Sequence, residues 1–328
     1  MPDPNIGELA ATVFERVVTK KPIEQWAGSF ALFMALGPDG MKSQEPGGRL
    51  IEADLEYAQN STFRSYGELE ELDTTRVNVF DAARYEWKIH AGTVVFSDLE
   101  KLRAAGPEAK VDLVTAKVDN AMNSHMANLN TAGFLDGTGN GGKDIEGLTK
   151  LISETPSTGT VGGINRATFS CWRNIAVSGA KTLSAFDNIR SAFTTCNMRT
   201  SRGGTKDLCK AIVTSRTVLE GYASTLQTYE RYAMDGKKMR GANGAMDVGG
   251  GLMHAQAEMF YDEDCSPSDS AYFLNSESLK FYYLKGAWMK AKPAVEPANQ
   301  LSAIVRIFTS GNFGTSQSRR LGVVFDIT

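Results

Sequence analysis

The sequence is poor in cysteine and histidine, and neither residue type is grouped. The cysteines are too widely spaced for a disulfide framework or a C-x-x-C metal site; they are Cys171, Cys196, Cys209 and Cys265. The histidines show no H-x-x-x-H or H-E-x-x-H spacing; they are His90, His125 and His254. We therefore predict no metal site and no disulfide scaffold.

Long hydrophobic runs are also missing. The apolar stretch at 26–36 is shorter than the roughly 20 residues that cross a bilayer. The first residues, MPDPNIGELA, lack the basic start and apolar core of a signal peptide. We expect synthesis in a reducing cytosol and no contact with a membrane.

Charge of one sign is not in excess. The 328 residues carry a net charge of −3, with 42% hydrophobic and 22% charged residues. This composition is typical of a globular protein with a substantial core. It differs from that of a strongly basic nucleic-acid binder, so any contact with nucleic acid is expected to be local or non-specific.

The N-terminal third predicts two helical or apolar pieces followed by a long β arm. Residues 6–20 have the spacing of an amphipathic helix, 23–36 are apolar, and 37–48 are rich in helix breakers. Apolar and polar residues then alternate over 49–59 and over 79–96, which predicts two strands. The polar segment 60–78 joins them. Since isolated two-stranded ribbons are marginally stable in water, we expect the arm to rest on another chain.

The strongest helix prediction covers residues 107–132. Apolar residues recur there at spacings of three and four, and Pro107 suits a first helical turn. His125 lies on this apolar stripe and is expected to be a packed, hydrogen-bonded residue. The helix would be roughly 40 Å long, which is enough for a structural spine.

The remainder predicts a mixed α/β region. Helices are expected at 180–198 and 216–232, and a glycine-rich loop at 235–251. Strands are expected at 208–215, 252–261, 271–274 and 279–284, and a C-terminal pair at 301–308 and 320–327.

The stretch LDGTGNGGKDIEGL at 135–148 resembles two nucleotide-binding patterns. Gly137, Gly139 and Gly142 fit G-x-G-x-x-G, and Lys143 nearly completes a phosphate loop, in which Asp144 replaces the required Ser or Thr. Both patterns need a strand before the glycines, whereas a long helix is predicted there. We interpret the stretch as a turn that ends the helix, with a nucleotide-dependent enzyme as the alternative.

Other chemical candidates are weak. The acidic segment 261–269 does not match a calcium loop and is interpreted as a solvated turn. Lys237, Lys238 and Arg240 could contact phosphate or a neighbouring subunit, or could simply be solvated. No Ser–His–Asp order or G-x-S-x-G motif is present. We predict no catalytic residue, no cofactor and no enzymatic activity.

Residues 155–174, TPSTGTVGGINRATFSCWRN, resemble a segment of tailed-bacteriophage major capsid proteins. The matching positions are Gly162, Gly163, Asn165, Arg166, Ala167, Thr168, Trp172, Arg173 and Asn174. The arm, the long helix, the stretch after it and the segment 297–324, with Asn312 and the Arg319–Arg320 pair, follow in the order found in that family. The resemblance covers nearly the whole chain.

This resemblance implies an α+β Hong Kong 97-type capsid fold. The implied parts are an N-terminal arm at 1–46, an extended β loop at 47–96, a peripheral domain at 97–154 around the spine helix, an axial domain at 155–298, and C-terminal strands at 299–328 that return to the peripheral domain. The implied function is a major capsid protein that forms hexamers and pentamers of an icosahedral head around double-stranded DNA. An encapsulin-like compartment shell, which shares this fold, is the alternative.

The same resemblance implies partners and contact residues. The partners are copies of this chain and a portal, with a separate scaffolding protein and a decoration protein as further options, in a virion assembled in the bacterial cytoplasm. Packaged DNA would be touched non-specifically. No Lys–Asn pair for covalent cross-linking is identified. The candidate inter-subunit contacts lie on the arm and are Arg64, Glu68, Glu70, Glu71, Asp73, Arg76, Tyr85 and Trp87.

Overall fold

A computed structural model describes residues 32–33, 42–103, 107–179, 185–198, 209–227, 252–254, 257–275, 277–297 and 300–327. The helix expected at 6–20, most of the apolar piece at 23–36 and the glycine-rich loop at 235–251 lie outside these residues. Lys237, Lys238 and Arg240 lie outside them as well.

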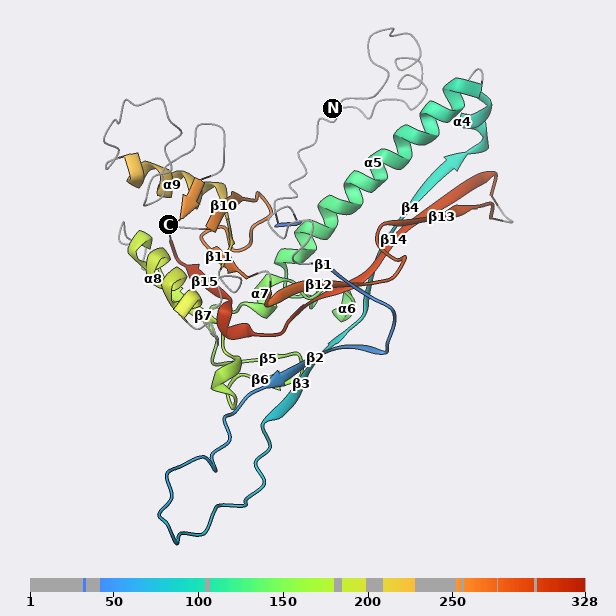
Figure 1. The fold of residues 1–328 in the computed structure, drawn as a ribbon. Helices are drawn as coiled ribbons and strands as arrows, with labels where there is room; N and C mark the ends of the chain where they lie inside the picture. The colour runs from blue at the N-terminus through green and yellow to red at the C-terminus, as the bar shows by residue number, and fades with distance from the viewer. Residues whose placement is uncertain are drawn as a thin grey trace, which may run out of the picture.

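A long helix packs along a five-stranded sheet in an elongated part of the molecule (Figure 1). The helix α5 (Pro107–Phe134) confirms the expected spine. Its apolar residues Val118 and Met122 pack on Val94, Phe96 and Ile307 of the sheet. The sheet has the order β1 (Lys42–Glu45), β12 (Leu279–Leu284), β14 (Ser302–Thr315) and β13 (Lys290–Val295), and β4 (Lys88–Ser97) also pairs with β14. A short helix, α4 (Asp98–Arg103), follows β4.

A second sheet, which has six strands, lies near the C-terminal end of α5 (Figure 1). Its order is β7 (Ile175–Ser178), β15 (Gly322–Phe325), β11 (Ala271–Leu274), β8 (Ala211–Thr214), β10 (Ala257–Tyr261) and β9 (Leu252–His254). Alternate residues of a strand face opposite sides. Ile212 and Phe273 accordingly pack with α8 (Ala185–Met198) and α9 (Arg216–Gln227), while Val213 and Tyr272 join the main core.

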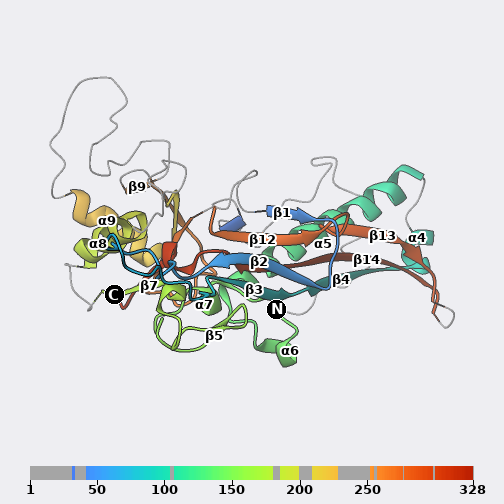
Figure 2. The same ribbon diagram turned by 60° about the horizontal axis from the view of Figure 1, so that its bottom comes forward.

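A two-stranded ribbon made of β2 (Leu50–Glu56) and β3 (Phe80–Glu86) forms the base of the arm. In Figure 1, the loop 57–79 projects from this ribbon, away from both sheets. Figure 2 shows the molecule turned, so that it is seen to be wider than it is deep. A smaller pair, β5 (Thr160–Val161) and β6 (Ile164–Asn165), is followed by the short 3-10 helix η1 (Ser170–Trp172).

Several strand predictions need correction. Residues 79–96 form two strands rather than one, because the chain leaves its pairing with β2 at Trp87 and pairs with β14. The described residues within 252–261 form two antiparallel strands, β9 and β10, rather than one. The two C-terminal strands do not pair, since β14 and β15 belong to different sheets. The strand β13 was not predicted.

The sheet membership also differs from the expected domain boundaries. β12 and β13 fall within the predicted axial segment 155–298, yet both pair with β14 in the sheet that packs on α5. β15 falls within the predicted returning segment 299–328, yet it lies in the six-stranded sheet. The chain therefore passes between the two sheets before β12 and again after β14.

Candidate inter-subunit surface

The side chains of the motif at 162–174 make hydrogen bonds to other residues of the same chain. Arg166 is 1% exposed, and its guanidinium donates to the backbone oxygen of Leu151. Burial lowers the pKa of Arg166 to about 10. Arg173 donates from Nε to the backbone oxygen of Arg166 (2.7 Å) and from Nη2 to that of Ala167 (2.8 Å). The two arginines thus fix the shape of this loop.

The same loop is joined to the ribbon. The backbone N–H of Arg84 in β3 donates to the oxygen of Gly162 (2.9 Å). A Cβ atom on Gly162 would lie 2.9 Å from Cβ of Ala83 and 3.0 Å from the Tyr85 hydroxyl. Trp172 donates from its indole N–H to the backbone oxygen of Val161 (3.0 Å). The close approach explains why a glycine with a positive φ of 58° stands at position 162.

Three asparagines complete the junction. Asn174 accepts from the backbone N–H of Ser153 and donates to the oxygen of the same residue (3.2 and 2.8 Å). Asn165 accepts from the N–H of Ala167 (2.8 Å). Asn312 of β14 accepts from the N–H of Glu146 and donates to the oxygen of Glu86 (3.0 and 2.9 Å). Asn165 closes a local turn, whereas Asn174 and Asn312 connect segments that are far apart in the sequence.

The tip of the arm is exposed and carries both charges and apolar side chains. Arg64 and Glu70 form an ion pair at 3.4 Å within the loop. The other four charged candidates are exposed on the same loop; they are Glu68, Glu71, Asp73 and Arg76. Phe63, Leu69 and Leu72 are 86%, 101% and 69% exposed. Exposed large apolar side chains gathered on one loop mark a surface suited to a partner.

The base of the arm rests on its own subunit, contrary to expectation. Ile51, Ala83 and Tyr85 belong to the main core. Tyr85 is 1% exposed, and its hydroxyl donates to the backbone oxygen of Thr315 (2.9 Å). Its ring is therefore unavailable to a neighbour. Trp87 is half-buried and donates to the backbone oxygen of Gly48 (3.0 Å).

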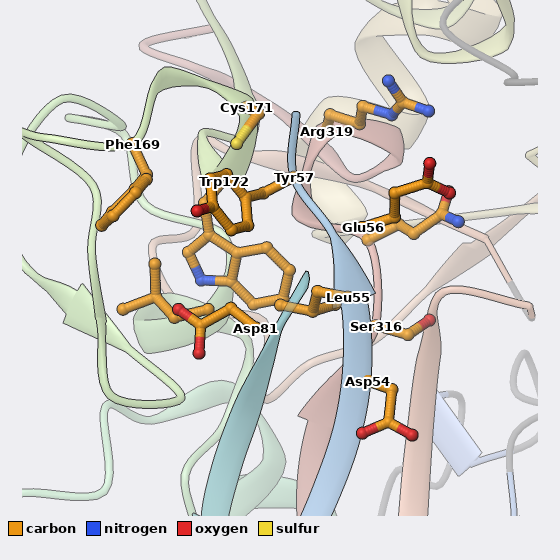
Figure 3. A pocket seen from close by; sticks show the side chains of 12 residues that line it. Asp54, Leu55, Glu56, Tyr57, Asp81, Phe169, Cys171, Trp172, Ser316 and Arg319 are labelled. Carbon is orange, nitrogen blue, oxygen red and sulfur yellow. The ribbon is translucent and has the colours of Figure 1, made fainter. Parts of the chain in front are cut away.

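A pocket with a volume of about 370 Å³ lies where the ribbon meets the 164–172 segment and the end of β14 (Figure 3). Its lining residues are Asp54, Leu55, Glu56, Tyr57, Asp81, Ile164, Phe169, Cys171, Trp172, Ser316, Gln317 and Arg319. In Figure 3, Asp81 lies on the same side of β2 as the rings of Phe169 and Trp172, whereas Glu56 and Arg319 lie on the other side. The pocket thus combines aromatic rings with more carboxylates than cations.

The glycine-rich stretch does not form a phosphate loop. Helix α5 precedes it, and Gly137, with a φ of +75°, turns the chain after that helix. The helices that follow, α6 (Gly139–Gly142) and α7 (Leu148–Leu151), have four residues each. Lys143 is exposed and Asp144 half-buried. The interpretation of 135–148 as a turn is supported, because the strand that a nucleotide site needs before the glycines is replaced by α5.

His125 is packed and hydrogen-bonded, as predicted. It is 5% exposed, and its Nε2 lies 2.8 Å from the hydroxyl of Thr309. The ring centroid of His90 lies 4.7 Å from that of His125. Burial and the neighbouring His90 lower the pKa of His125 to about 4. The periodicity of α5 identified the buried position but not its partner.

The prediction for the acidic segment 261–269 is partly wrong. Asp262 is fully buried and accepts hydrogen bonds from the backbone N–H of Leu32 (3.0 Å) and from Asn130 (2.9 Å). The sequence offered no signal for this, because both donors come from distant segments. Cys171 is exposed, unlike the other three cysteines. Within the described ranges, no cluster of metal-ligating side chains is found, and no helix is both long and apolar enough to span a membrane.

Comparison with known proteins gives a consistent result at the level of the fold. No family model and no curated protein matches the sequence. Among solved structures, the capsid of cyanophage A-1(L) is 15% identical, with a TM-score of 0.70 over 96% of this chain and 98% of that one. The capsid of a native GTA particle is 10% identical, with a TM-score of 0.62 over the full length of both chains.

An encapsulin has a similar fold. The SrpI encapsulin of Synechococcus elongatus is 7% identical, with a TM-score of 0.59 over 100% of this chain and 96% of that one. The chain therefore has the fold of phage capsid proteins, and the expected α+β capsid fold is confirmed.

Proposed function

We propose that this protein is the major capsid protein of a tailed bacteriophage and assembles into hexamers and pentamers of an icosahedral head. The full-length similarity to a cyanophage capsid subunit carries this proposal. The exposed arm supports it, since a loop that presents Phe63, Leu69 and Leu72 to solvent is suited to contact with other copies. A structural role also agrees with the motif at 162–174, because its described side chains form hydrogen bonds within their own chain.

Within this proposal, the arm tip supplies contacts between subunits. Exposed ion pairs contribute only about 0–1 kcal/mol each, but every contact is repeated throughout a shell. The charged candidates on the tip are Arg64, Glu68, Glu70, Glu71, Asp73 and Arg76. The burial of Tyr85 removes it from this set. The segments around α5 and around the six-stranded sheet would serve as the peripheral and axial domains.

The proposal includes further partners. A portal, a separate scaffolding protein and a decoration protein would join the shell, and double-stranded DNA would be enclosed and touched non-specifically. The net charge of −3 is compatible with a wall that does not grip DNA. Assembly would take place in the cytoplasm of the host bacterium, and the mature protein would reside in the virion.

Size-exclusion chromatography followed by negative-stain electron microscopy tests the proposal. The purified chain, alone or in a lysate with its phage partners, is expected to elute as closed particles. A stable monomer under all these conditions would argue against a shell role.

An encapsulin-like compartment is the second candidate, because the SrpI encapsulin aligns over the full chain. The two candidates differ in their contents. DNA that is protected from nuclease inside purified particles supports the capsid role, whereas co-purifying enzymes with no DNA support the compartment.

A further inference from the structure

We propose that the pocket at the base of the arm is the receptor for the arm tip of a neighbouring copy, and that it takes Phe63 together with Arg64. This inference rests on the proposed shell function and names the two surfaces that join subunits. None of the residues that line this pocket was among the predicted inter-subunit contacts, although Trp172 belongs to the motif.

One face of the pocket is suited to a cation held against aromatic rings. Leu55 and Asp81 are directly opposite each other in the β2–β3 pairing, so their side chains share one face of the ribbon. Tyr57 also lies on this face, and its ring meets that of Phe169 edge-on at 5.7 Å. Asp81 is therefore a carboxylate beside Leu55, Tyr57 and Phe169, which is an arrangement that attracts a guanidinium or ammonium group.

The charges of the lining residues favour a cationic occupant. On the face that carries the aromatic rings the carboxylate is Asp81, whereas Asp54 and Glu56 lie on the other side of β2 together with Arg319 (Figure 3). Among the described residues, no lysine or arginine forms an ion pair with any of these three carboxylates. A cation that enters beside the aromatic rings would thus meet, in Asp81, a carboxylate that forms no ion pair with a described lysine or arginine.

The arm tip offers the complementary pair of side chains. Of the large apolar side chains exposed in the described part of the chain, Phe63 is the one followed directly by a lysine or arginine. Phe63 is 86% exposed and the Arg64 side chain 58% exposed. Arg64 now lies 4.9 Å from the centroid of the Tyr66 ring and pairs with Glu70. These exposed contacts are weak enough to be exchanged for the pocket.

The occupant would come from a second copy. The loop 57–79 projects away from the body of its own subunit (Figure 1), and Phe63 lies outside its own pocket. Burial of an exposed phenylalanine against Leu55, Phe169 and Ile164 supplies the hydrophobic part of the contact. The charge pair with Asp81 fixes its orientation.

Cys171 makes the contact directly testable, because it lines the pocket and is the exposed cysteine while the other three are buried. A Ser65→Cys variant places a thiol beside Arg64. Particles of this variant, treated with a mild oxidant or a short thiol–thiol cross-linker, are expected to give a ladder of covalent multimers on a denaturing gel. There are three matched controls, in which no ladder is expected. They are the unmodified chain, the Ser65→Cys/Cys171→Ser double variant and a Glu71→Cys variant.

The charge contact has its own pair of variants. Asp81→Asn, in the Ser65→Cys background, is expected to weaken the ladder. Glu52→Gln alters the opposite face of the same ribbon, where it breaks only an exposed ion pair with Arg84, and should leave the ladder unchanged.

The outcomes separate this inference from the proposed function. Closed particles of Ser65→Cys without a ladder would overturn the pocket contact and leave the shell role standing. Cross-linking only within single chains, or an equal ladder from Glu71→Cys, would overturn it too. If the unmodified chain forms no particles, the shell proposal itself fails, and the inference fails with it.

Discussion

Gly162 shows at the level of a single residue how the motif stabilises the subunit. A methyl group there would press on Ala83 and Tyr85 and would also require a positive φ. Gly162→Ala should therefore combine about 1–2 kcal/mol of backbone strain with about 1–3 kcal/mol of overpacking. Chemical denaturation of the unassembled subunit measures this loss in the free energy of unfolding.

Gly163 provides the matched control. Its φ of +80° is also positive, but no atom of the described residues lies within 4 Å of the place that a methyl group would take there. Gly163→Ala should show the strain alone and cost clearly less than Gly162→Ala. Equal losses at the two positions would contradict the close packing of the motif against the ribbon.

His125 predicts a pH dependence of stability. Its pKa in the folded subunit, about 4, is below the ordinary value of 6.5. The neutral ring is therefore favoured by folding, and the unfolded chain binds the proton first as the pH falls. The subunit should keep full stability from His125 above pH 6.5 and lose on the order of 3 kcal/mol between pH 6.5 and 4.

The comparison with His125→Gln isolates this contribution from that of the carboxylates. Glutamine can form a hydrogen bond with the Thr309 hydroxyl but does not titrate. Thermal melts of both proteins between pH 7 and 4 should show a smaller decline in the variant. Parallel pH profiles would mean that the titration of the buried His125 does not control acid stability.

At the level of elements, the arm separates into a structural base and an external loop. The base contributes Ile51, Ala83 and Tyr85 to the core, whereas the loop 57–79 contributes no buried residue. Deletion of residues 60–78 should leave the subunit folded, with a nearly unchanged circular dichroism spectrum and melting temperature, but should block shell assembly. Electron microscopy and sedimentation measure the assembly.

A glycine–serine linker of equal length in place of 60–78 is the control for that deletion. It keeps the reach of the loop but removes Phe63, Arg64 and the acidic side chains. Failure of both variants to assemble would assign the contact to these side chains. Normal particles from the deletion would refute the role of the arm.

Some elements could be predicted from the sequence because their information is local. The three- and four-residue spacing that ends in Leu129 specifies α5, and Gly137 marks its exit. The break at Trp87 could not be predicted, since apolar residues alternate without interruption through Tyr85, Trp87 and Ile89 while the pairing partner changes from β2 to β14. Strand pairing is a long-range property that periodicity does not contain.

The candidate site was predictable in part for the same reason. The composition of the loop indicated a charged tip, and the motif at 162–174 was recognised by its resemblance. The buried environment of Asp262 was missed because its donors, Leu32 and Asn130, come from distant segments. The pocket was missed because its walls come from the ribbon, the 164–172 segment and the end of β14.

At the level of the whole molecule, two sheets, a spine helix and a projecting arm form a subunit with several outward surfaces. Its described part contains no cluster of metal-ligating side chains. The architecture matches that of phage capsid subunits over nearly the entire chain. We expect the protein to function only as part of an assembly, in which each surface meets another copy.

A cryo-electron microscopy reconstruction of particles formed by the unmodified chain tests this expectation most directly. The account predicts closed icosahedral shells of five- and six-membered rings, with the loop 57–79 of each subunit in contact with a neighbour. A protein that stays monomeric with and without its phage partners, or that forms assemblies in which this loop is free in solvent, would contradict it.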